Sequence, residues 1–548
     1  MIRKIGQGVA GAALLIGVVT MAARIVGFGR YFVQSHTVGN LCLSNAYNTA
    51  NYVPNIVFEL VAGGALAGMV VPVLASPASR AGTDPEARAE VGRITSALLT
   101  WAMLALVPLT LIIAAFAGPI VTLLVGNVPE CDVSQVVAAG TSMLVVFAPR
   151  MIFFGLAVVL YGVLQAHRRF MGPTLAPLVS SLLIVASYLV FGPVSDGAAD
   201  DLSRLTTAGQ LTLSLGATVA AAAMVVTVAG PVARLKLRLR PSLSFPPGVA
   251  ARAGRLATAG LAVLIAQQVT LTVVVSLAND LGGRGVTGLY TYSWALYQLP
   301  FAVLVVPIAT SSFPALSARA TDGDRAGFDG LAASSTRAIL LVTGLAAGVM
   351  AAVAMPVSRV FLEGTPGGED PGEMAAAVAL FAPGLVGYAL MFHLARVLYA
   401  HGRGRPAAVA SVAGWAVALV AQIFLARAAH ARPEVVGQLA LGSTVGMTVG
   451  GVLLVLAVLG TVGRATLDGT WRALLAAVLG GIAAYGAGIT VVTAFHDVSR
   501  WMCVVVGAGA AVAGSAVFAI VAGVIDRPDA RMLLGRFRRV SDTAGGNR

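Results

Sequence analysis

The chain has 548 residues, of which 58% are hydrophobic and only 11% are charged. A soluble protein of this length needs far more charge to cover its apolar core, so this composition excludes an ordinary globular protein. The net charge of +13 would suggest nucleic-acid binding in a soluble protein, but here we assign the basic residues to a cytoplasmic membrane face with anionic lipids.

Apolar stretches of about 20 residues recur along the chain, which is the pattern of transmembrane α-helices. We therefore predict an all-α polytopic membrane protein with fourteen transmembrane helices. The predicted ranges are 9–36, 44–75, 94–124, 135–164, 173–194, 208–230, 253–279, 284–317, 335–362, 374–400, 407–428, 436–461, 471–494 and 500–525.

The charges of the loops support this count. With a cytoplasmic N-terminus, 26 of the 36 basic residues fall in the alternate, inner segments, and only five fall in outer loops. The remaining five lie within helices. By the positive-inside rule, this asymmetry places both termini in the cytoplasm.

The first predicted helix contains two arginines, Arg24 and Arg30, in the stretch ARIVGFGR. An arginine at the bilayer centre costs at least about 2.5–3.5 kcal/mol and stays charged, so each must face protein, water or an anion. The two positions lie about 120° apart on a straight helix. We expect Gly27 and Gly29 to form a hinge that turns both arginines toward one cavity.

The second helix is unusually polar, so its polar face must point away from lipid. Its Glu59 is the one deep carboxylate, and it either pairs with Arg24 or Arg30 or leaves them to a phosphate-bearing ligand, whose oxygens match guanidinium groups. Arg150, beside a kink at Pro149, is either a third phosphate ligand or part of a structural pair. The other residues of this helix that we assign to substrate binding are Asn45, Asn48, Asn51 and Asn55.

The sequence contains an internal repeat of six helices. YGVLQAHRRFMGP at 161–173 is similar to VLYAHGRGRP at 397–406, and Pro54 aligns with Pro300. Because six is even, both halves begin on the same side, so we predict two parallel, pseudo-symmetric six-helix bundles with a cavity between them, and Pro54 and Pro300 as hinges. The predicted domains are an N-terminal bundle at 1–230, a basic cytoplasmic linker at 231–252, a C-terminal bundle at 253–461, helices 13 and 14 at 462–525, and a basic cytoplasmic tail at 526–548.

The sequence shows no motif for catalysis, nucleotide binding or metal binding. We therefore expect a secondary transporter that is not an enzyme and uses no cofactor and no metal. The three cysteines are all expected near outer helix ends. Cys42 and Cys131 are either bonded to each other or unpaired, and Cys503 has no expected partner.

The same stretches resemble a known family. ARIVGFGRYFV at 23–33 and SNAYNTANYVPNIVFELVAGGALAGMVVPVLA at 44–75 are similar to the opening of the MurJ (MviN) lipid II flippases, of the multidrug/oligosaccharidyl-lipid/polysaccharide exporter (MOP) superfamily. The resemblance continues at 162–179, 292–317 and 383–406, and the VFEL variant resembles the actinobacterial branch.

This resemblance implies a flippase of the bacterial cytoplasmic membrane. It would move undecaprenyl-pyrophosphate-linked disaccharide-pentapeptide from the inner to the outer leaflet for cell-wall synthesis. The resemblance implies that Arg24 and Arg30 bind the pyrophosphate in a cationic cavity, and that helices 13 and 14, at about 471–525, form a groove for the lipid tail. Anionic membrane lipids and cell-wall synthesis enzymes are further expected partners, and nucleic acid is not.

The sequence also departs from the family pattern. Asn45 replaces an acid of well-studied relatives, and Ala295 replaces an arginine of their cavity. Phe58 and Glu59 stand where those relatives carry a basic pair. The seventh, eleventh and twelfth helices lack the carboxylates that bind sodium in some relatives, so we expect no such site.

Two other functions stay open at this stage. The first is export of another polyprenyl-linked glycan or of a cationic drug, in which Glu59 would couple to protons or bind the cation. The second is a non-transporting scaffold for cell-wall enzymes.

Overall fold

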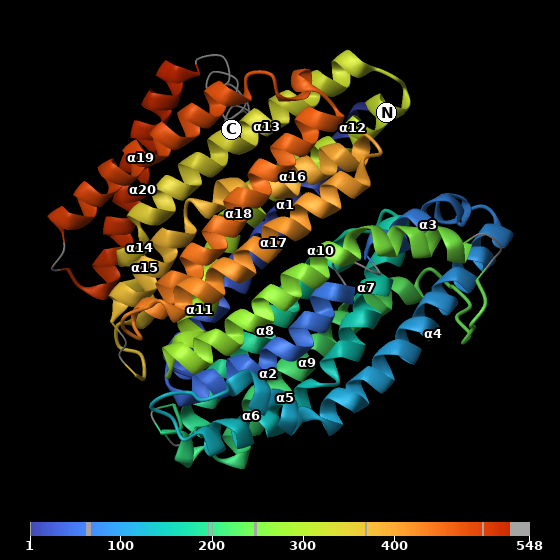
Figure 1. The fold of residues 1–548 in the computed structure, drawn as a ribbon. Coiled ribbons are helices and arrows are strands. Elements are labelled where there is room, and N and C mark those ends of the chain that lie inside the picture. Colours follow the sequence, from blue (N-terminus) through green and yellow to red (C-terminus); the bar gives the residue numbers. More distant parts are fainter. Residues whose placement is uncertain are drawn as a thin grey trace. The chain divides into compact units, whose positions relative to one another are not determined.

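The computed structural model describes residues 2–61, 67–195, 197–199, 201–245, 249–367, 370–495 and 498–526, in which every regular element is a helix (Figure 1). Eleven helical segments of this part are long and apolar enough to cross a membrane, or twelve if one bent pair counts as a single span. The predicted all-α polytopic fold is confirmed, whereas the count of fourteen spans stays a prediction.

Contacts between residues divide the chain into two compact units. Unit 1 comprises Met1–Gly288 with Thr365–Gly367, and unit 2 comprises Leu289–Gly364 with Gly368–Arg548. The boundary does not fall in the predicted linker, because the seventh long helix packs on elements of unit 1. The predicted domain limits therefore stay a prediction based on the repeat in the sequence.

Unit 1 has its polar second helix in the interior. This helix, α2, packs on α5, α6 and α7, while α8 packs on α1 and α9, and α10 packs on α3 and α5. The unit contains α1 (Ile2–Thr37), α2 (Cys42–Phe58), α3 (Ala67–Arg80), α4 (Pro85–Ala115), α5 (Ala117–Val125), α6 (Val133–Phe147), α7 (Arg150–Ala166), α8 (Met171–Val194), a 3₁₀ turn (Leu202–Arg204), α9 (Thr207–Ala233), α10 (Val249–Leu277) and a π-helical turn (Ala278–Gly282).

Unit 2 has α18 in contact with α15, α16 and α17, while α13 packs on α16, α19 and α20. The last two helices, red in Figure 1, run side by side. The unit contains most of α11 (Val286–Pro300), a π-helical turn (Phe301–Val305), α12 (Val306–Thr321), α13 (Arg325–Ala352), α14 (Ala354–Leu362), α15 (Pro371–Phe381), α16 (Gly384–Ala400), α17 (Gly404–Arg427), α18 (Glu434–Thr461), a 3₁₀ turn (Arg464–Leu467), α19 (Thr470–Ala494) and α20 (Arg500–Ile525).

One helix break occurs in both units at matching positions. The tripeptide Phe-Ala-Pro separates α6 from α7 at 147–149, and it separates α15 from α16 at 381–383, where the axes bend by 43°. Proline breaks a helix because it has no amide hydrogen and clashes with the preceding turn. In unit 1 the Thr218 hydroxyl donates to the carbonyl of Val146 (2.8 Å), and in unit 2 Thr444 donates to Leu380 (2.6 Å).

The helices after these breaks also end alike. The amide of Arg169 donates to the carbonyl of Leu164, and the amide of Arg403 donates to that of Leu398, both at 2.8 Å. In each case the residue before the arginine has a positive φ, which closes the helix in a left-handed turn. These two passages are the ones that the repeat in the sequence aligns, so the two units share local structure as well as sequence.

Glycines bring α16, α17 and α18 of unit 2 close to one another. A Cβ added at Gly414 would lie 2.8 Å from the Cα of Gly450, and one added at Gly442 would lie 2.6 Å from the Cγ of Gln422. A Cβ at Gly387 would overlap the carbonyl oxygen of Met447. Small residues that let helix backbones touch are characteristic of helix packing in membranes.

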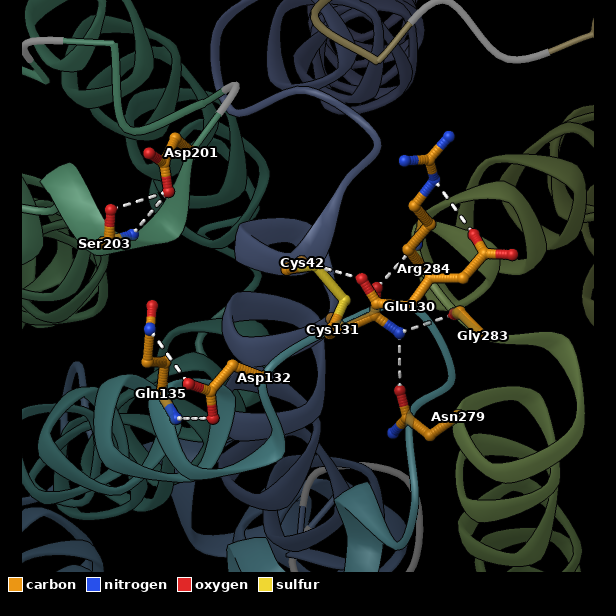
Figure 2. Close-up of a disulfide and its surroundings, with 12 residues drawn as sticks. Cys42, Glu130, Cys131, Asp132, Gln135, Asp201, Ser203, Asn279, Gly283 and Arg284 are labelled. Atoms are coloured by element: carbon orange, nitrogen blue, oxygen red, sulfur yellow. Dashed lines mark hydrogen bonds and ion pairs between the residues drawn. A yellow bond between two sulfur atoms is a disulfide. The ribbon is translucent and has the colours of Figure 1, made fainter.

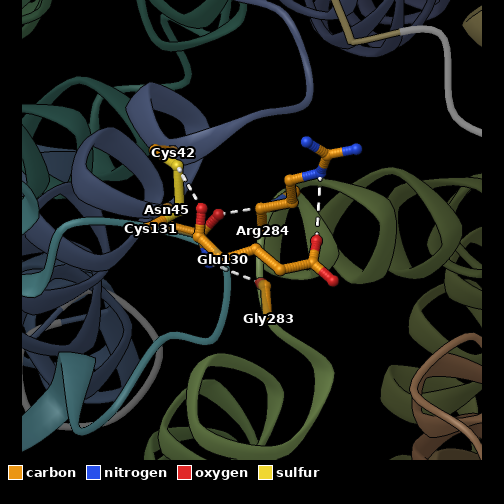
Figure 3. Close-up of polar contacts among 7 residues, drawn as sticks. Cys42, Asn45, Glu130, Cys131, Gly283 and Arg284 are labelled. Atoms are coloured by element: carbon orange, nitrogen blue, oxygen red, sulfur yellow. Dashed lines mark hydrogen bonds and ion pairs between the residues drawn. A yellow bond between two sulfur atoms is a disulfide. The ribbon is translucent and has the colours of Figure 1, made fainter. Parts of the chain in front are cut away.

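A disulfide joins Cys42, at the start of α2, to Cys131, just before α6 (Figure 2). Of the two alternatives for Cys42 and Cys131, the structure therefore supports the bonded one. Cys503 is free and buried. An ion pair lies beside the disulfide, in which Arg284 approaches Glu130 at 3.2 Å (Figure 3). The disulfide closes a segment of 89 residues, so it restricts the unfolded chain strongly.

Replacing Cys42 by serine is expected to lower the free energy of unfolding of the purified protein by about 2–4 kcal/mol, because the unfolded chain regains freedom. Thermal unfolding in detergent, with and without reductant, measures the effect. Reductant should destabilise the wild type and a Cys503→Ala control, but not Cys42→Ser. Identical unfolding of the wild type and Cys42→Ser would contradict the prediction.

Candidate substrate-binding site

The two arginines of α1 have different surroundings. Arg30 is half-buried, and its guanidinium donates to the hydroxyl of Tyr31 (3.0 Å) and lies 4.9 Å from that ring's centroid. Arg24 is exposed and has no side-chain partner within the described residues. The helix continues without a break through Gly27 and Gly29, so a hinge at these glycines stays a prediction.

Arg150 is the most buried arginine of the predicted site, with 5% of its surface exposed. Its guanidinium donates to the side-chain oxygen of Asn51 and lies 5.2 Å and 5.4 Å from the ring centroids of Phe147 and Phe154. The Nε atom is buried and makes no hydrogen bond. The structural pair expected for Arg150 is therefore with Asn51, and one donor of the guanidinium is left over.

A network of neutral polar groups runs along α2 in the interior of unit 1. The amide of Gln34 donates to Asn48 (2.9 Å), which in turn donates to Ser44 (3.0 Å). The hydroxyls of Tyr47 and Tyr188 lie 2.9 Å apart. Both Arg30 and Arg150 are within electrostatic range of these two tyrosines and of each other. The sequence indicated Asn48 but neither its partner Gln34 on α1 nor the hydroxyl pair of Tyr47 and Tyr188.

Asn45 holds α2 to the turn between α10 and α11 (Figure 3). Its amide donates to Asn279 (2.8 Å) and to the carbonyl of Gly283 (3.0 Å), and its oxygen accepts from the amide of Gly285 (2.6 Å). Both of its amide hydrogens are used, and Asn279 also donates to Thr49. These contacts give Asn45 a structural role, and we leave it out of the binding site proposed below.

Glu59 forms no ion pair in the described part of the chain, so the pair with Arg24 or Arg30 that the sequence allowed is absent. Its side chain is exposed and lies in a π-helical turn at 59–61. Asn55, one turn earlier, is half-buried. Like Pro54, Pro300 is followed by a π-helical turn, at 301–305, which places irregular backbone after both predicted proline hinges.

The interior of unit 1 therefore holds positive charge without a balancing acid. Within the described residues, none of the three predicted arginines, Arg24, Arg30 and Arg150, has a carboxylate within 4 Å. Two nearby cations repel each other in a medium of low polarity. The arrangement suits an anionic ligand, and phosphate is well matched because its oxygens accept paired guanidinium hydrogen bonds.

An apolar groove of about 830 Å³ lies in unit 2, lined by α13, α15, α16, α18 and α19. Leu474, Val478 and Ile482 of α19 form one wall, and Gly344 and Gly348 of α13 line the groove where α13 packs directly on the α19 backbone. The sequence placed a tail groove on helices 13 and 14. The groove's residues from those two helices all come from α19, and the rest come from three earlier spans that sequence patterns did not indicate.

Unit 2 contains a cluster of aromatic side chains from α11, α15 and α16. Tyr297 lies 5.2 Å from Phe381 and 5.3 Å from Trp294 between ring centroids, and Tyr388 lies 5.9 Å from Tyr297. The described residues contain no group of three or more histidine, cysteine, aspartate or glutamate side chains that could hold a metal ion.

Comparison with known proteins places these features in a family. The family model described as "Lipid II flippase MurJ" matches residues 34–506. The chain belongs to the MurJ lipid II flippase family. Curated MurJ relatives include "Lipid II flippase MurJ" of Burkholderia cenocepacia, 25% identical over 405 residues (71% of this chain and 73% of the relative), and "Probable lipid II flippase MurJ" of Rhizobium meliloti, 25% identical over 351 residues (64% and 62%).

Solved structures show that the MurJ fold is retained. The structure "Lipid II flippase MurJ, inward closed conformation" superposes with a TM-score of 0.73 at 15% identity and covers 94% of this chain and 99% of its own. A multidrug resistance MATE family transporter of the MOP superfamily, in an inward-facing conformation, superposes with a TM-score of 0.61 at 13% identity, covering 81% and 96%. At these identities the likeness concerns the fold alone.

The MurJ family match begins at residue 34, after both arginines of α1. It includes Arg150, the polar face of α2 and the groove of unit 2. Membership in the MurJ family, a family of transporters, therefore rests on parts of the chain other than Arg24 and Arg30, and the role of these two residues has to be tested separately.

Proposed function

We propose that this chain flips lipid II, the undecaprenyl-pyrophosphate-linked disaccharide-pentapeptide, from the inner to the outer leaflet of the bacterial cytoplasmic membrane by alternating access. The observation that carries the proposal, beside membership in the family, is the set of arginines in unit 1 that have no acidic partner. A pyrophosphate brings the missing negative charge, and guanidinium groups bind it through paired, charge-assisted hydrogen bonds.

In this proposal Arg30 and Arg24 hold the pyrophosphate, with Arg150 adding positive charge from the bundle interior. Asn48, Asn51 and Asn55 orient the neighbouring groups as polar members of α2. The groove of unit 2 holds part of the polyprenyl chain, since its lining is almost entirely apolar.

The orientation of the chain belongs to the same proposal. The turns after α3, α7 and α9 line one pocket, and the turns before α2, after α5 and after α10 are joined at the other end by the disulfide and by Asn45. Successive loops of unit 1 thus lie alternately at its two ends, as expected for helices that cross a membrane back and forth. The positive-inside rule assigns this arginine-rich end of unit 1 to the cytoplasm, and the even number of predicted spans puts both termini on that side.

Lipid II is expected to co-purify with the wild-type protein and to be lost from the double variant Arg24→Ala/Arg30→Ala, because two charge-assisted contacts disappear. Native mass spectrometry of protein purified from a lipid II-producing host measures the bound lipid. Arg427→Ala, which removes one exposed arginine of unit 2, is the control and should retain it. Equal retention of lipid II by the double variant and the wild type would refute the assignment of the site.

The exposed, unpaired Glu59 favours one competing function, export of a cationic drug. In that case drug efflux from whole cells depends on Glu59 and persists in the Arg24→Ala/Arg30→Ala variant. Loss of lipid II transport in the arginine variant, with no efflux that depends on Glu59, rejects it. A scaffolding role for cell-wall enzymes is rejected by the same loss of transport.

A further inference from the structure

A second cationic site lies at the end of unit 1 where α3, α7 and α9 end and α4 begins. A pocket of about 860 Å³ is formed there by the turns 78–82, 165–169 and 234–236 together with the first turns of α4. Its basic lining residues are Arg88, His167, Arg168, Arg169, Arg234 and Lys236. In the proposed function they serve only to orient the chain, and none of them contacts the transported lipid.

The positive charge of this pocket is not neutralised by the protein. None of the residues that line it is acidic. Arg88 is held by the carbonyls of Ala81 (3.0 Å) and Gly82 (3.4 Å), which fixes its position but leaves its charge unpaired. The side chains of Arg168, Arg169, Arg234 and Lys236 are exposed and make no hydrogen bond or ion pair within the described residues. Cations gathered in one concave site repel each other unless an anion enters.

The backbone of the pocket is unfavourable for the side chains it carries. Arg168 and Lys236 have φ values of +57° and +52°, in the left-handed region that favours glycine. The repeat offers a direct comparison, since the residue that matches Arg168 in unit 2 is Gly402, at φ +75°. Arginine at a backbone position that favours glycine, and that is glycine in the repeat, indicates a functional role for the charged side chain.

The position of the pocket indicates a lipid as the source of the anion. Arg168 and Arg234 lie two residues and one residue beyond apolar spans that end at Ala166 and Ala233, where lipid headgroups are expected. Another wall is apolar and includes Val71 of α3. A soluble phosphate gains nothing from contact with an apolar wall. A phospholipid can place its phosphate among the cations and its glycerol and first methylenes against the apolar side.

We propose that this pocket binds the phosphate headgroup of an anionic phospholipid of the surrounding leaflet. The site differs from that of the transported lipid, because its residues lie at the helix ends and not along α1 and α2. Basic pockets between transmembrane helices are a recognised means of holding anionic lipids in place.

The test compares two double variants that remove the same charge from matching turns. Arg168→Gln/Arg169→Gln removes two cations from the pocket, and Arg403→Gln/Arg405→Gln removes two from the matching turn of unit 2, which does not line the pocket. Each protein is reconstituted into nanodiscs of phosphatidylglycerol or of phosphatidylcholine and then released into detergent. Native mass spectrometry measures how many lipid molecules stay bound. The first variant should retain roughly 30-fold less phosphatidylglycerol, the loss expected for two cations at an anionic site, and the second should match the wild type.

A single variant separates folding from binding. Arg168→Gly relieves the backbone at φ +57° and removes one cation, so we expect the melting temperature to stay equal or rise while phosphatidylglycerol retention falls. Unchanged retention in Arg168→Gly and in the Arg168/Arg169 variant overturns the proposal, as does equal loss in both double variants. Inorganic pyrophosphate that stabilises the lipid-free wild type, but not the Arg168/Arg169 variant, assigns the site to a soluble anion and also overturns it.

Discussion

Replacing Arg30 by alanine is expected to abolish growth of cells that depend on this chain for lipid II flipping, while the protein still inserts and folds. Arg30 has no carboxylate partner, so its removal leaves no buried acid unpaired, and only the Tyr31 hydroxyl loses its donor. The lost charge-assisted contact with pyrophosphate costs about 1.5–3 kcal/mol, or roughly 10- to 150-fold in binding.

Complementation of a flippase-depleted strain measures this effect, with immunoblots of membrane fractions to show equal insertion. Arg30→Lys keeps the charge but loses the planar fork, so it should restore growth only in part. Arg427→Ala should grow like the wild type, since Arg427 is exposed and lies in unit 2. Normal growth of an Arg24→Ala/Arg30→Ala double variant would reject the phosphate-binding role of both residues.

Filling the groove of unit 2 is expected to block transport without unfolding the protein. Val478 lines the groove and is 47% exposed, so the Val478→Trp indole can enter the groove without displacing buried side chains. A polyprenyl chain then loses its place along α19. We expect at least about a tenfold drop in transport, which needs the loss of only about 1.4 kcal/mol of binding.

The matched control is Val505→Trp on α20. Val505 is 63% exposed and does not line the groove, so the same change in volume should leave transport unchanged. Transport of fluorescent lipid II in proteoliposomes is the measurement, and thermal unfolding in detergent reports folding. Equal transport by the two tryptophan variants would show that the groove does not receive the lipid tail.

Hydrophobic length and loop charge predicted most of the helices, because both follow directly from the thickness and polarity of a bilayer. The breaks were harder to predict. Pro149 indicated the interruption between α6 and α7, since a proline acts locally. The interruption at Phe116, between α4 and α5, was not expected, although Pro119 in the first turn of α5 has no amide hydrogen to donate back to Ala115, the last residue of α4.

Long-range partners account for what the sequence did not predict about the site. Asn45 looked like a ligand on a polar helix face, yet it pairs with Asn279, 234 residues away, and no local pattern indicates that contact. Arg150 could be identified as costly to bury, but not that Asn51 and two phenylalanines surround it. The groove was placed on the last two helices only because of a resemblance, and its other walls come from three other spans.

The glycine contacts among α16, α17 and α18 also bear on how unit 2 can move. Where backbones approach this closely, few side chains can change rotamer to absorb a shift, so we expect these three helices to move together. Gly344 and Gly348 hold α13 against α19 in the same way, because a Cβ at Gly348 would overlap the carbonyl oxygen of Gly481. Unit 2 thus contains two helix groups held by close backbone contacts, α16–α18 and the pair α13 and α19, and the groove is lined by both. A shape change of unit 2 during transport is therefore expected as a movement of one group relative to the other, which changes the width of the groove.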